Sequence, residues 1–394
     1  MTPHPYQLGT RCARAGTTRD AGGRNHPVQP PIVQSAIFDL GDSAEAEAIF
    51  SGTQQGYAYS RFGNPTVDAL AAALADLEDG ADALITSSGN AATLCAITAA
   101  LQGRTGPLVG HHDLYGGSFE LLHLLEKTYR VPVRLVDPQD EAAWLQAVGE
   151  AGAVLIETPS NPLMRLIDLR ATITRAHAAG APVIVDNTVA TPFNQRPFAL
   201  DADWIVHSTT KYLNGHGDLI GGCLVSRTPL TAAQRSLHKN LGGTVNAFEA
   251  WLVLRGLRTF ALRMAAHNTS ARLIAEWLQG RPEVSQVYYP GLADHPQRAL
   301  FEQQMTHGGG LLSFQLAGDD AAATRFLDRL SLIVHAVSLG GPETLITRPA
   351  RSSHRGMTPE ARQRAGVSDT LVRLSVGLEA PEDLIADLEQ ALAG

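Results

Sequence analysis

From about residue 60, short apolar runs alternate with Ala- and Leu-rich stretches of helical periodicity, and this alternation restricts the fold more than any other feature. We expect buried strands at 83–86, 106–110, 153–157, 182–186 and 204–207, with helices between them such as 67–79 and 169–180. Strands joined by helices run parallel, and both faces of their sheet are covered. The sequence therefore predicts an α/β fold with a mostly parallel central sheet and helices on both faces.

The second half of the chain is organised differently. A long helical pattern covers residues 246–280, and further strands are expected at 311–316, 332–337 and 371–376. This mixture predicts a smaller C-terminal α+β domain. Residues 1–35, rich in Gly, Pro and Arg, are typical of an extended arm or of a frayed terminus. The predicted domains are an N-terminal arm at 1–60, a large domain at 61–250 and a C-terminal domain at 251–394.

Charge and hydropathy exclude several classes of partner. The 394 residues carry a formal net charge of -8 without a basic run, so nucleic acids and anionic membrane surfaces are poor partners. No apolar stretch approaches the roughly 20 residues that span a bilayer, and residues 1–23 lack the apolar core of a secretory signal. The scattered Cys12, Cys95 and Cys223 favour a reducing cytoplasm without disulfides. No metal site is expected, because none of the histidine pairs has convincing ligand spacing, including His111, His112, His216 and His354.

Polar residues follow each of the expected strands. They are Ser87 to Asn90, Tyr115 to Gly117, Glu157 with Ser160 to Pro162, Asp186 to Thr188, and Ser208 to Lys211. Ligands of open α/β sheets bind beyond the carboxyl ends of the strands. Five consecutive corners with polar side chains at one rim therefore predict a binding site there.

Lys211 is one of only three lysines among 31 basic residues. Arginine stays protonated, whereas a lysine amine with a lowered pKa can act as a nucleophile or Schiff-base partner. Ser208 and Lys211 also match the Ser-x-x-Lys motif of penicillin-binding proteins and β-lactamases. That interpretation is disfavoured, because the accompanying Ser-Asp-Asn and Lys-Thr-Gly motifs are missing and Ser208 ends a strand instead of opening a helix.

The segment SSGNAATL (87–94) predicts a helix start whose N–H groups could hold an anion, or simply a helix N-cap. Neither a Gly-x-Gly-x-x-Gly nor a Walker motif is present, so a single phosphate fits better than a dinucleotide. Asp186 ends an apolar strand and is either a satisfied core carboxylate or the partner of a protonated ring nitrogen. A monophosphate site, a ring-nitrogen acid and Lys211 on one rim together predict pyridoxal 5'-phosphate (PLP).

Eight motifs of this chain resemble those of the Cys/Met-metabolism PLP enzymes, the group of cystathionine γ-synthase, cystathionine γ-lyase, methionine γ-lyase and sulfhydrylases. The motifs are YSRFGNPT (59–66), SSGNAA (87–92), DLYGGS (113–118), ETPSNP (157–162), VDNTVATP (185–192), HSTTKYLNGHGD (207–218), SLGGPETLI (338–346) and RLSVGLE (373–379). The resemblance implies the PLP-dependent transferase type I fold and a homotetramer of two tight dimers, with the N-terminal arm on the neighbouring subunit.

The resemblance also implies roles for single residues. Lys211 would bind the cofactor covalently and move protons between substrate carbons, Asp186 would keep the ring nitrogen protonated, and Tyr115 would stack on the ring. Ser88, Gly89, the backbone of Asn90, Ser208 and Thr210 would hold the phosphate, and Asn161 would bind the ring hydroxyl. Tyr59 and Arg61 would reach the phosphate of the neighbouring subunit. Arg373 would bind the substrate α-carboxylate, and Ser338 would position the lysine.

Departures from the family pattern bear on the reaction. Glu120 stands where cysteine-handling members carry an arginine for a distal carboxylate, and Gly117 stands where methionine γ-lyases typically have cysteine. Asn90, Pro342 and Arg348 are also atypical, and Ser338-Leu339 disfavours a cystathionine β-lyase. The predicted activity is a carbon–sulfur γ-lyase acting on a methionine-, homocysteine- or cystathionine-type amino acid. The alternatives are γ-replacement, as in cystathionine γ-synthase or O-acylhomoserine sulfhydrylase, and a PLP-binding protein without turnover.

Overall fold

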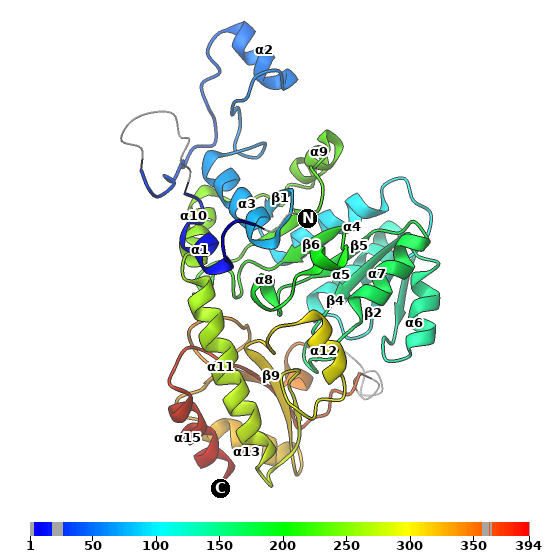
Figure 1. Ribbon diagram of the computed structural model, residues 1–394, viewed down its shortest axis with the longest axis vertical. Helices are drawn as coiled ribbons and strands as arrows, with labels where there is room; N and C mark the ends of the chain where they lie inside the picture. The colour runs from blue at the N-terminus through cyan, green and yellow to red at the C-terminus, as the bar shows by residue number, and fades with distance from the viewer. Residues whose placement is uncertain (1–3, 18–26, 357–361, 363–364, 394) are drawn as a thin grey trace.

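The computed structural model describes residues 4–17, 27–356, 362 and 365–393. Figure 1 shows a large α/β domain above a smaller C-terminal part, with the N-terminal segment projecting from the large domain. Within the described residues, seven strands form the large sheet in the order β1-β7-β6-β5-β4-β2-β3. They are β1 (Asp82–Thr86), β2 (Leu108–His111), β3 (Val133–Val136), β4 (Ala153–Glu157), β5 (Val183–Asp186), β6 (Trp204–His207) and β7 (Gly222–Ser226).

The large sheet confirms the predicted mostly parallel arrangement. In the sheet order β3-β2-β4-β5-β6, each strand pairs in parallel with the next. β7 runs antiparallel to both β6 and β1. The five predicted strands are present, with ends that differ by a few residues, whereas β3 and β7 were not predicted.

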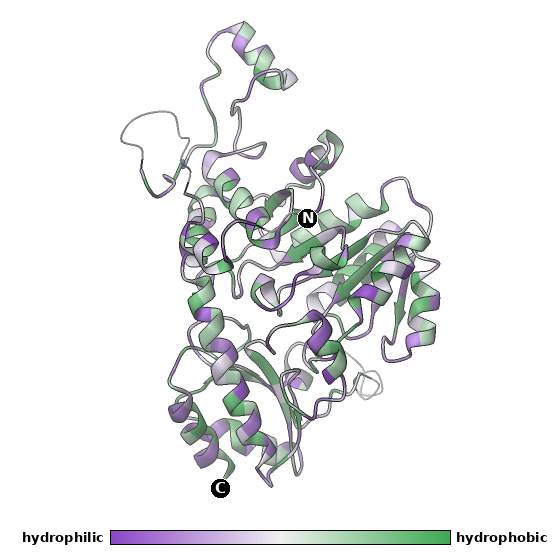
Figure 2. Ribbon diagram, viewed as in Figure 1, coloured by the Kyte–Doolittle hydropathy of each residue, from purple (hydrophilic) through white to green (hydrophobic). Residues whose placement is uncertain are grey.

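Helices cover both faces of the large sheet. The helical elements of the large domain are α3 (Pro65–Glu78), α4 (Gly89–Leu101), α5 (Gly116–Tyr129), α6 (Glu141–Val148), α7 (Leu169–Ala178), α8 (Thr191–Asn194), the 3-10 turn η1 (Pro197–Leu200) and α9 (Ala232–Leu241). Neighbouring strand residues belong to different apolar clusters: Val154 lies in the cluster that includes Leu70 of α3, and Leu155 lies in the cluster that includes Ala96 of α4. The strands are buried on both sides, and they are the most continuously hydrophobic part of the ribbon in Figure 2.

The C-terminal part contains a second sheet in the order β10-β11-β12-β9-β8. Its strands are β8 (Val284–Tyr288), β9 (Leu311–Leu316), β10 (Val334–His335), β11 (Leu345–Thr347) and β12 (Leu371–Ser375). The remaining elements are α10 (Ala247–Leu257), α11 (Phe260–Gln279), α12 (Arg298–Gln304), α13 (Asp320–Arg329), η2 (Pro349–Arg351) and α15 (Pro381–Leu392). The long helical pattern is therefore two helices, broken at Arg258 and Thr259, and the boundaries at 60 and 250 stay predictions.

The N-terminal arm is less extended than its composition indicated. It contains α1 (Leu8–Ala13) and α2 (Ser43–Ser51). Arg11 of α1 bonds to Asp76 at 3.0 Å and to Asp79 at 2.8 Å, which fastens this helix to the end of α3. By contrast, α2 buries no residue and stands away from the body in Figure 1. Residues 18–26 of the predicted arm lie outside the described residues.

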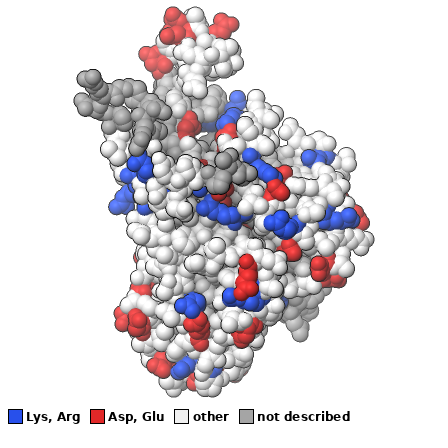
Figure 3. Space-filling view, in the orientation of Figure 1, with Lys and Arg blue, Asp and Glu red and all other residues white. Residues whose placement is uncertain are grey.

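Within the described residues, no helix is long and apolar enough to cross a membrane. The face shown in Figure 3 carries acidic and basic side chains interspersed with one another.

Candidate active site

Lys211 lies in the turn after β6, where it belongs to a chain of polar contacts that joins the two sheets. Its Nζ donates to Ser338 Oγ at 2.8 Å. The backbone oxygen of Ser338 accepts from Arg373 Nη2 at 3.0 Å, and Arg373 Nη1 donates to Asn161 Oδ1 at 3.2 Å. Four predicted site residues from distant parts of the sequence are thus connected.

The environment of Lys211 favours its neutral amine. Burial, with a smaller contribution from the charge of Arg373, lowers the pKa of Lys211 to about 8. At neutral pH roughly a tenth of such amines is unprotonated, far more than for an ordinary lysine. The amine is therefore suited to attack a carbonyl carbon or to accept a proton from carbon.

Ser338 has an unusual backbone conformation, with a φ of 126°. A residue with a side chain is strained in this region, at a cost of order 1–3 kcal/mol. The strain coincides with a hydroxyl aimed at Lys211 and a carbonyl aimed at Arg373. The surrounding packing therefore holds Ser338 where it can orient both cations.

Arg373, on β12, is only 6% exposed. Burial lowers its pKa to about 10, so it stays charged at neutral pH. Its Nε is buried and has no partner among the described residues. A buried unpaired donor requires an explanation, and a carboxylate ligand would supply the missing acceptor with bidentate geometry.

The start of α4 forms an anion cradle. Ser88 is the N-cap, and its hydroxyl accepts from Ala91 N–H at 3.1 Å. The backbone N–H groups of Gly89 and Asn90 make no hydrogen bond to another described residue. A Cβ on Gly89 would lie 2.9 Å from Ser208 Cβ, so only glycine allows Ser208 this close to the helix start. Two free N–H groups, a hydroxyl and a helix N-terminus are a suitable donor set for one phosphate.

Thr210 also borders this region, but its hydroxyl is already engaged. It accepts from Gly221 N–H at 2.9 Å and donates to Gly221 O at 3.3 Å. These bonds fix the turn between β6 and β7 that contains Lys211.

Asp186 and Glu157 are paired neighbours at the ends of β5 and β4. Asp186 accepts from Thr188 N–H at 3.0 Å, and burial raises its pKa. Glu157, 3% exposed, accepts from Tyr115 N–H at 2.6 Å, and burial together with Asp186 raises its pKa well above the ordinary value. Glu157 was predicted at a strand end without a role, and the structure shows that its carboxylate anchors the Tyr115 backbone.

Tyr115 is 45% exposed, and its ring lies against Gly117. A Cβ on Gly117 would come within 2.5 Å of Tyr115 Cε1 and 3.3 Å of Asn90 Nδ2. Asn90 Nδ2 donates to Gly117 O at 3.2 Å and so links the starts of α4 and α5. Asn90 and Gly117, the two residues here that are atypical of the family, therefore both influence where the Tyr115 ring lies.

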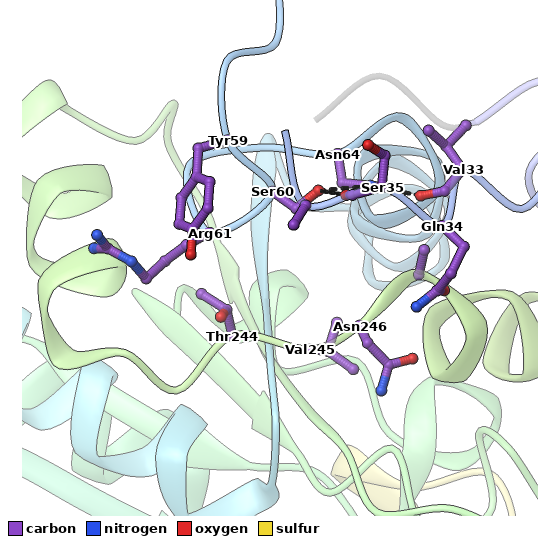
Figure 4. A pocket seen from close by; sticks show the side chains of 12 residues that line it. Val33, Gln34, Ser35, Tyr59, Ser60, Arg61, Asn64, Thr244, Val245 and Asn246 are labelled. Atoms are coloured by element: carbon purple, nitrogen blue, oxygen red, sulfur yellow. Dashed lines mark hydrogen bonds between the residues drawn. The ribbon is translucent and has the colours of Figure 1, made fainter. Parts of the chain in front are cut away.

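Tyr59 and Arg61 lie apart from this constellation, on a surface cavity of about 360 Å³ next to the N-terminal arm. Figure 4 shows their side chains beside Thr244, on the opposite side of the cavity from Val33. Arg61 Nη1 donates to Lys239 O at 2.9 Å, and its guanidinium lies 4.9 Å from the centre of the Phe62 ring. Within the described chain, neither residue makes a hydrogen bond to Lys211, Asp186 or Arg373.

The other departures have local explanations. Arg348 is 6% exposed and bonds to Thr324 Oγ1 at 2.9 Å and to Asp369 O at 3.0 Å, which ties β11 to α13. Pro342 O accepts from Leu378 N–H at 2.7 Å. Glu120 is exposed on α5 and makes no hydrogen bond or ion pair with another described residue.

The histidines make structural contacts. His111 Nε2 accepts from Glu157 N–H at 2.9 Å, and burial lowers its pKa to about 3. His354 contacts Ser353 Oγ at 2.9 Å, and burial beside Arg373 lowers its pKa to about 4. His216 contacts Asn214 O at 2.7 Å. Within the described ranges, no group of three or more His, Cys, Asp or Glu residues could hold a metal ion.

The assembled residues fit PLP. The cradle of α4 and Ser208 suits its phosphate, Asp186 suits a ring N–H, and the amine of Lys211 suits an aldehyde. Asn161 follows β4 and suits the ring hydroxyl. Tyr115 follows β2 and suits a face of the ring. Glu78, His207 and Gln195, buried behind the strand ends, were missed by sequence reasoning because no local pattern distinguishes them and only the fold brings them together.

Comparisons with known proteins agree with this fit. The family model described as Cys/Met metabolism PLP-dependent enzyme matches residues 9–393. The chain is 41% identical to the L-methionine gamma-lyase of Pseudomonas putida over 95% of this chain and 94% of that protein. It is 42% identical to the cystathionine gamma-synthase of Escherichia coli (strain K12) over 92% of each. A solved cystathionine gamma synthase from Xanthomonas oryzae pv. oryzae, in complex with cystathionine, superposes with a TM-score of 0.90 at 43% identity, covering 99% of this chain and 98% of that one.

Proposed function

Because the chain belongs to the Cys/Met-metabolism PLP-dependent enzymes, we propose that it is a carbon–sulfur γ-lyase. It would remove a thiol from Cγ of a methionine-, homocysteine- or cystathionine-type amino acid. With one water consumed, the products would be the thiol, an α-keto acid and ammonia. When bound, PLP supplies an electron sink for the carbanion formed at Cα.

The cofactor would be held by residues of three corners. The N–H groups of Gly89 and Asn90 and the hydroxyl of Ser208, at the helix start capped by Ser88, would bind the phosphate, with Thr210 fixing the adjacent turn. The Asp186 carboxylate would accept the ring N–H, Asn161 would donate to the ring hydroxyl, and Tyr115 would cover one ring face. Lys211 Nζ would be the point of covalent attachment.

The substrate would be held and deprotonated from the C-terminal side. Arg373 would bind the α-carboxylate through the donors that its bonds to Asn161 and Ser338 leave available. Lys211 Nζ, once released from the cofactor, would take the proton from Cα and return protons to the neighbouring carbons. Ser338 Oγ, at 2.8 Å from Nζ, would keep the amine directed toward the substrate.

One observation favours elimination from a substrate with an uncharged side-chain end. Glu120 lies one helical turn beyond Gly116 at the start of α5, is exposed and has no cationic partner among the described residues. An uncompensated carboxylate here would repel the distal carboxylate of cystathionine and accept an uncharged thioether. Like charges placed next to each other cost up to several kcal/mol, and each 1.4 kcal/mol changes selectivity about tenfold.

The γ-replacement alternative is supported by the similarity to cystathionine gamma-synthases, which is as high as that to methionine gamma-lyases. To separate the two, the purified protein is assayed for α-keto acid from methionine, homocysteine and cystathionine. The same preparation is assayed for cystathionine from an O-acylhomoserine and cysteine. Keto acid from methionine or homocysteine at the higher rate is the expected result, and product only in the replacement assay would overturn the γ-lyase proposal. A protein that binds PLP but turns over none of these substrates would match the third alternative.

We further propose that the active unit is a homotetramer of two dimers, in which Tyr59 and Arg61 reach the phosphate of the partner subunit. The supporting observation is that both side chains line a surface cavity apart from the polar chain around Lys211. The expected compartment is the cytoplasm, which is supported by the three buried free cysteines.

A further inference from the structure

A buried acid–base pair lies behind the strand ends of the site. Glu78, the last residue of α3, places Oε1 2.5 Å from His207 Nε2 at the end of β6. The two side chains are each 1% exposed. Neither residue belongs to the cofactor or substrate contacts described above, and neither can exchange its partner for water.

The pair is part of a network that extends across three strands. Asn187 Nδ2 donates to Glu78 Oε1 at 2.9 Å. The Asn187 amide also pairs with Gln195, whose Nε2 donates to Asn187 Oδ1 at 3.2 Å and to Thr158 O at 2.9 Å. Thr158, Asn187 and His207 lie at the ends of β4, β5 and β6, so the network fixes the spacing of three neighbouring strand ends.

Those same strand ends carry the proposed cofactor residues. Asp186 directly precedes Asn187, and Ser208 directly follows His207. Successive residues of an extended strand point to opposite sides. The network residues therefore lie on the side away from the ligand, while Asp186 and Ser208 face it.

The charges around Asp186 explain why a histidine is placed here. Glu157 on β4 and Glu78 on α3 are acidic, and Cys223 on β7 has its thiol pKa raised well above the ordinary value by burial and by both Glu78 and Asp186. Burial raises the pKa of Asp186, and His207 is among the groups that oppose this increase. Glu78 holds the His207 ring next to the paired ends of β5 and β6, where Asp186 lies.

We propose that Glu78 and His207, with Asn187 and Gln195, are positioning residues that keep the Asp186 carboxylate charged and aimed at the cofactor ring nitrogen. This inference rests on the proposed role of Asp186 but not on the choice between elimination and replacement. Glu78 holds the His207 ring in place through their buried hydrogen bond, and His207 opposes the increase that burial causes in the pKa of Asp186. Asn187 and Gln195 keep the three strand ends in place.

The test uses Glu78→Gln, which keeps the shape of Glu78 and removes its charge, and His207→Gln, which keeps a donor toward Glu78 and removes the imidazole. PLP binding to the apo-protein and the visible absorption of the bound cofactor are measured as functions of pH. We expect each variant to bind PLP about tenfold more weakly at neutral pH, as for a shift of about one pKa unit. As pH falls, the loss of binding should begin at a higher pH than in the wild type, because Asp186 protonates more readily.

Controls separate this inference from the proposed site and from a loss of stability. Glu276→Gln, at an exposed ion pair on α11, should behave as the wild type. Asp186→Asn should weaken PLP binding more than either network variant; if it has no effect, the proposed cofactor site is wrong. If Asp186→Asn acts as expected while both network variants keep the wild-type affinity and pH midpoint, the positioning role is refuted. A network variant that unfolds more easily yet keeps the wild-type pH midpoint would also refute it.

Discussion

At the scale of single residues, the site depends on groups whose chemistry is changed by burial. Lys211 and Arg373 are both cations in a region of low exposure, and each has a lowered pKa for that reason. The consequence differs, because the lysine becomes partly neutral at physiological pH while the arginine stays charged. The hydrogen-bonded series of side chains thus contains a base, Lys211, and a permanently charged anion-binding group, Arg373.

Lys211 should react with PLP in a pH-dependent manner that reports its buried pKa. In the apo-protein the rate of covalent attachment, trapped by borohydride, should rise with pH through a midpoint near 8, because only the neutral amine attacks the aldehyde. Arg373→Met should move this midpoint upward, since the arginine charge contributes to the lowered pKa of Lys211. A midpoint above 10 in the wild type would contradict the burial argument.

Position 117 should tolerate only glycine without a change in the site. In Gly117→Ala the added methyl would lie 2.5 Å from the Tyr115 ring, which must move. Overpacking of this kind costs about 1–3 kcal/mol, so we expect PLP to dissociate at least about fivefold more readily, as measured by equilibrium dialysis. Gly9→Ala, whose nearest neighbour would be 4.0 Å away, is the matched control and should leave the affinity unchanged.

At the scale of elements, α11 supports the turn that contains Lys211. Arg263 of α11 is 7% exposed and donates to Tyr212 O and Gly256 O, each at 2.8 Å. Its guanidinium lies where a Cβ on Gly215 would be, so helix and turn are in direct contact. The long helix α11 and the lysine turn of the large domain therefore form one packed unit.

Arg263→Met should be destabilising, because it leaves buried carbonyl oxygens without donors. Each such group costs about 1–3 kcal/mol, so we expect the free energy of unfolding to fall by about 3 kcal/mol in a denaturant titration. Arg272→Met, on the same helix, removes an exposed pair with Glu276 and should change stability by less than about 0.5 kcal/mol. Equal losses in the two variants would show that Arg263 has no special role.

The elements also show how far the sequence could predict this structure. β4 and β6 have the bounds that their apolar runs indicated, because strands buried on both faces have a continuous hydrophobic signal. β3 was missed because it is an edge strand in which exposed Arg134 interrupts that signal. The break between α10 and α11 was missed because apolar periodicity continues through Arg258 and Thr259.

Residues of the candidate site were predictable where they follow a strand in a recognisable motif, as do Lys211, Asp186 and Gly89. The network behind them was not predictable in the same way. Glu78 lies near the end of an ordinary Ala-rich helix, and His207 ends an apolar strand 129 positions later. Only the packing of α3 against the large sheet brings the two side chains together, and no local pattern encodes that contact.

At the scale of the whole molecule, the proposed site needs two chains, and this can be tested by complementation. A Lys211→Ala variant and an Arg61→Ala variant should each have little activity alone. Refolded together, they should form mixed dimers in which one site combines an intact Lys211 with an intact Arg61 from the partner, so activity should reappear to about a quarter of the wild-type level. This fraction follows from random pairing of subunits in closed dimers.

Mixing two Lys211 variants, such as Lys211→Ala with Lys211→Met, is the control and should restore nothing. Activity that stays absent in the mixture of Lys211→Ala and Arg61→Ala, although mass measurement shows mixed dimers, would mean that Arg61 serves its own chain.

The pairing of β1 with β7 has a consequence for how the chain is made. β1 precedes the other strands of its sheet in the sequence, yet its hydrogen-bonding neighbour is β7, so that Asp82 pairs with Ser226. During translation β1 therefore lacks its β7 partner until nearly the whole large domain has left the ribosome. Such late, long-range closure slows folding and leaves an edge exposed to aggregation. We therefore expect chaperones to bind the nascent chain while the segment between β1 and β7 is being synthesised, and to be released once β7 has emerged.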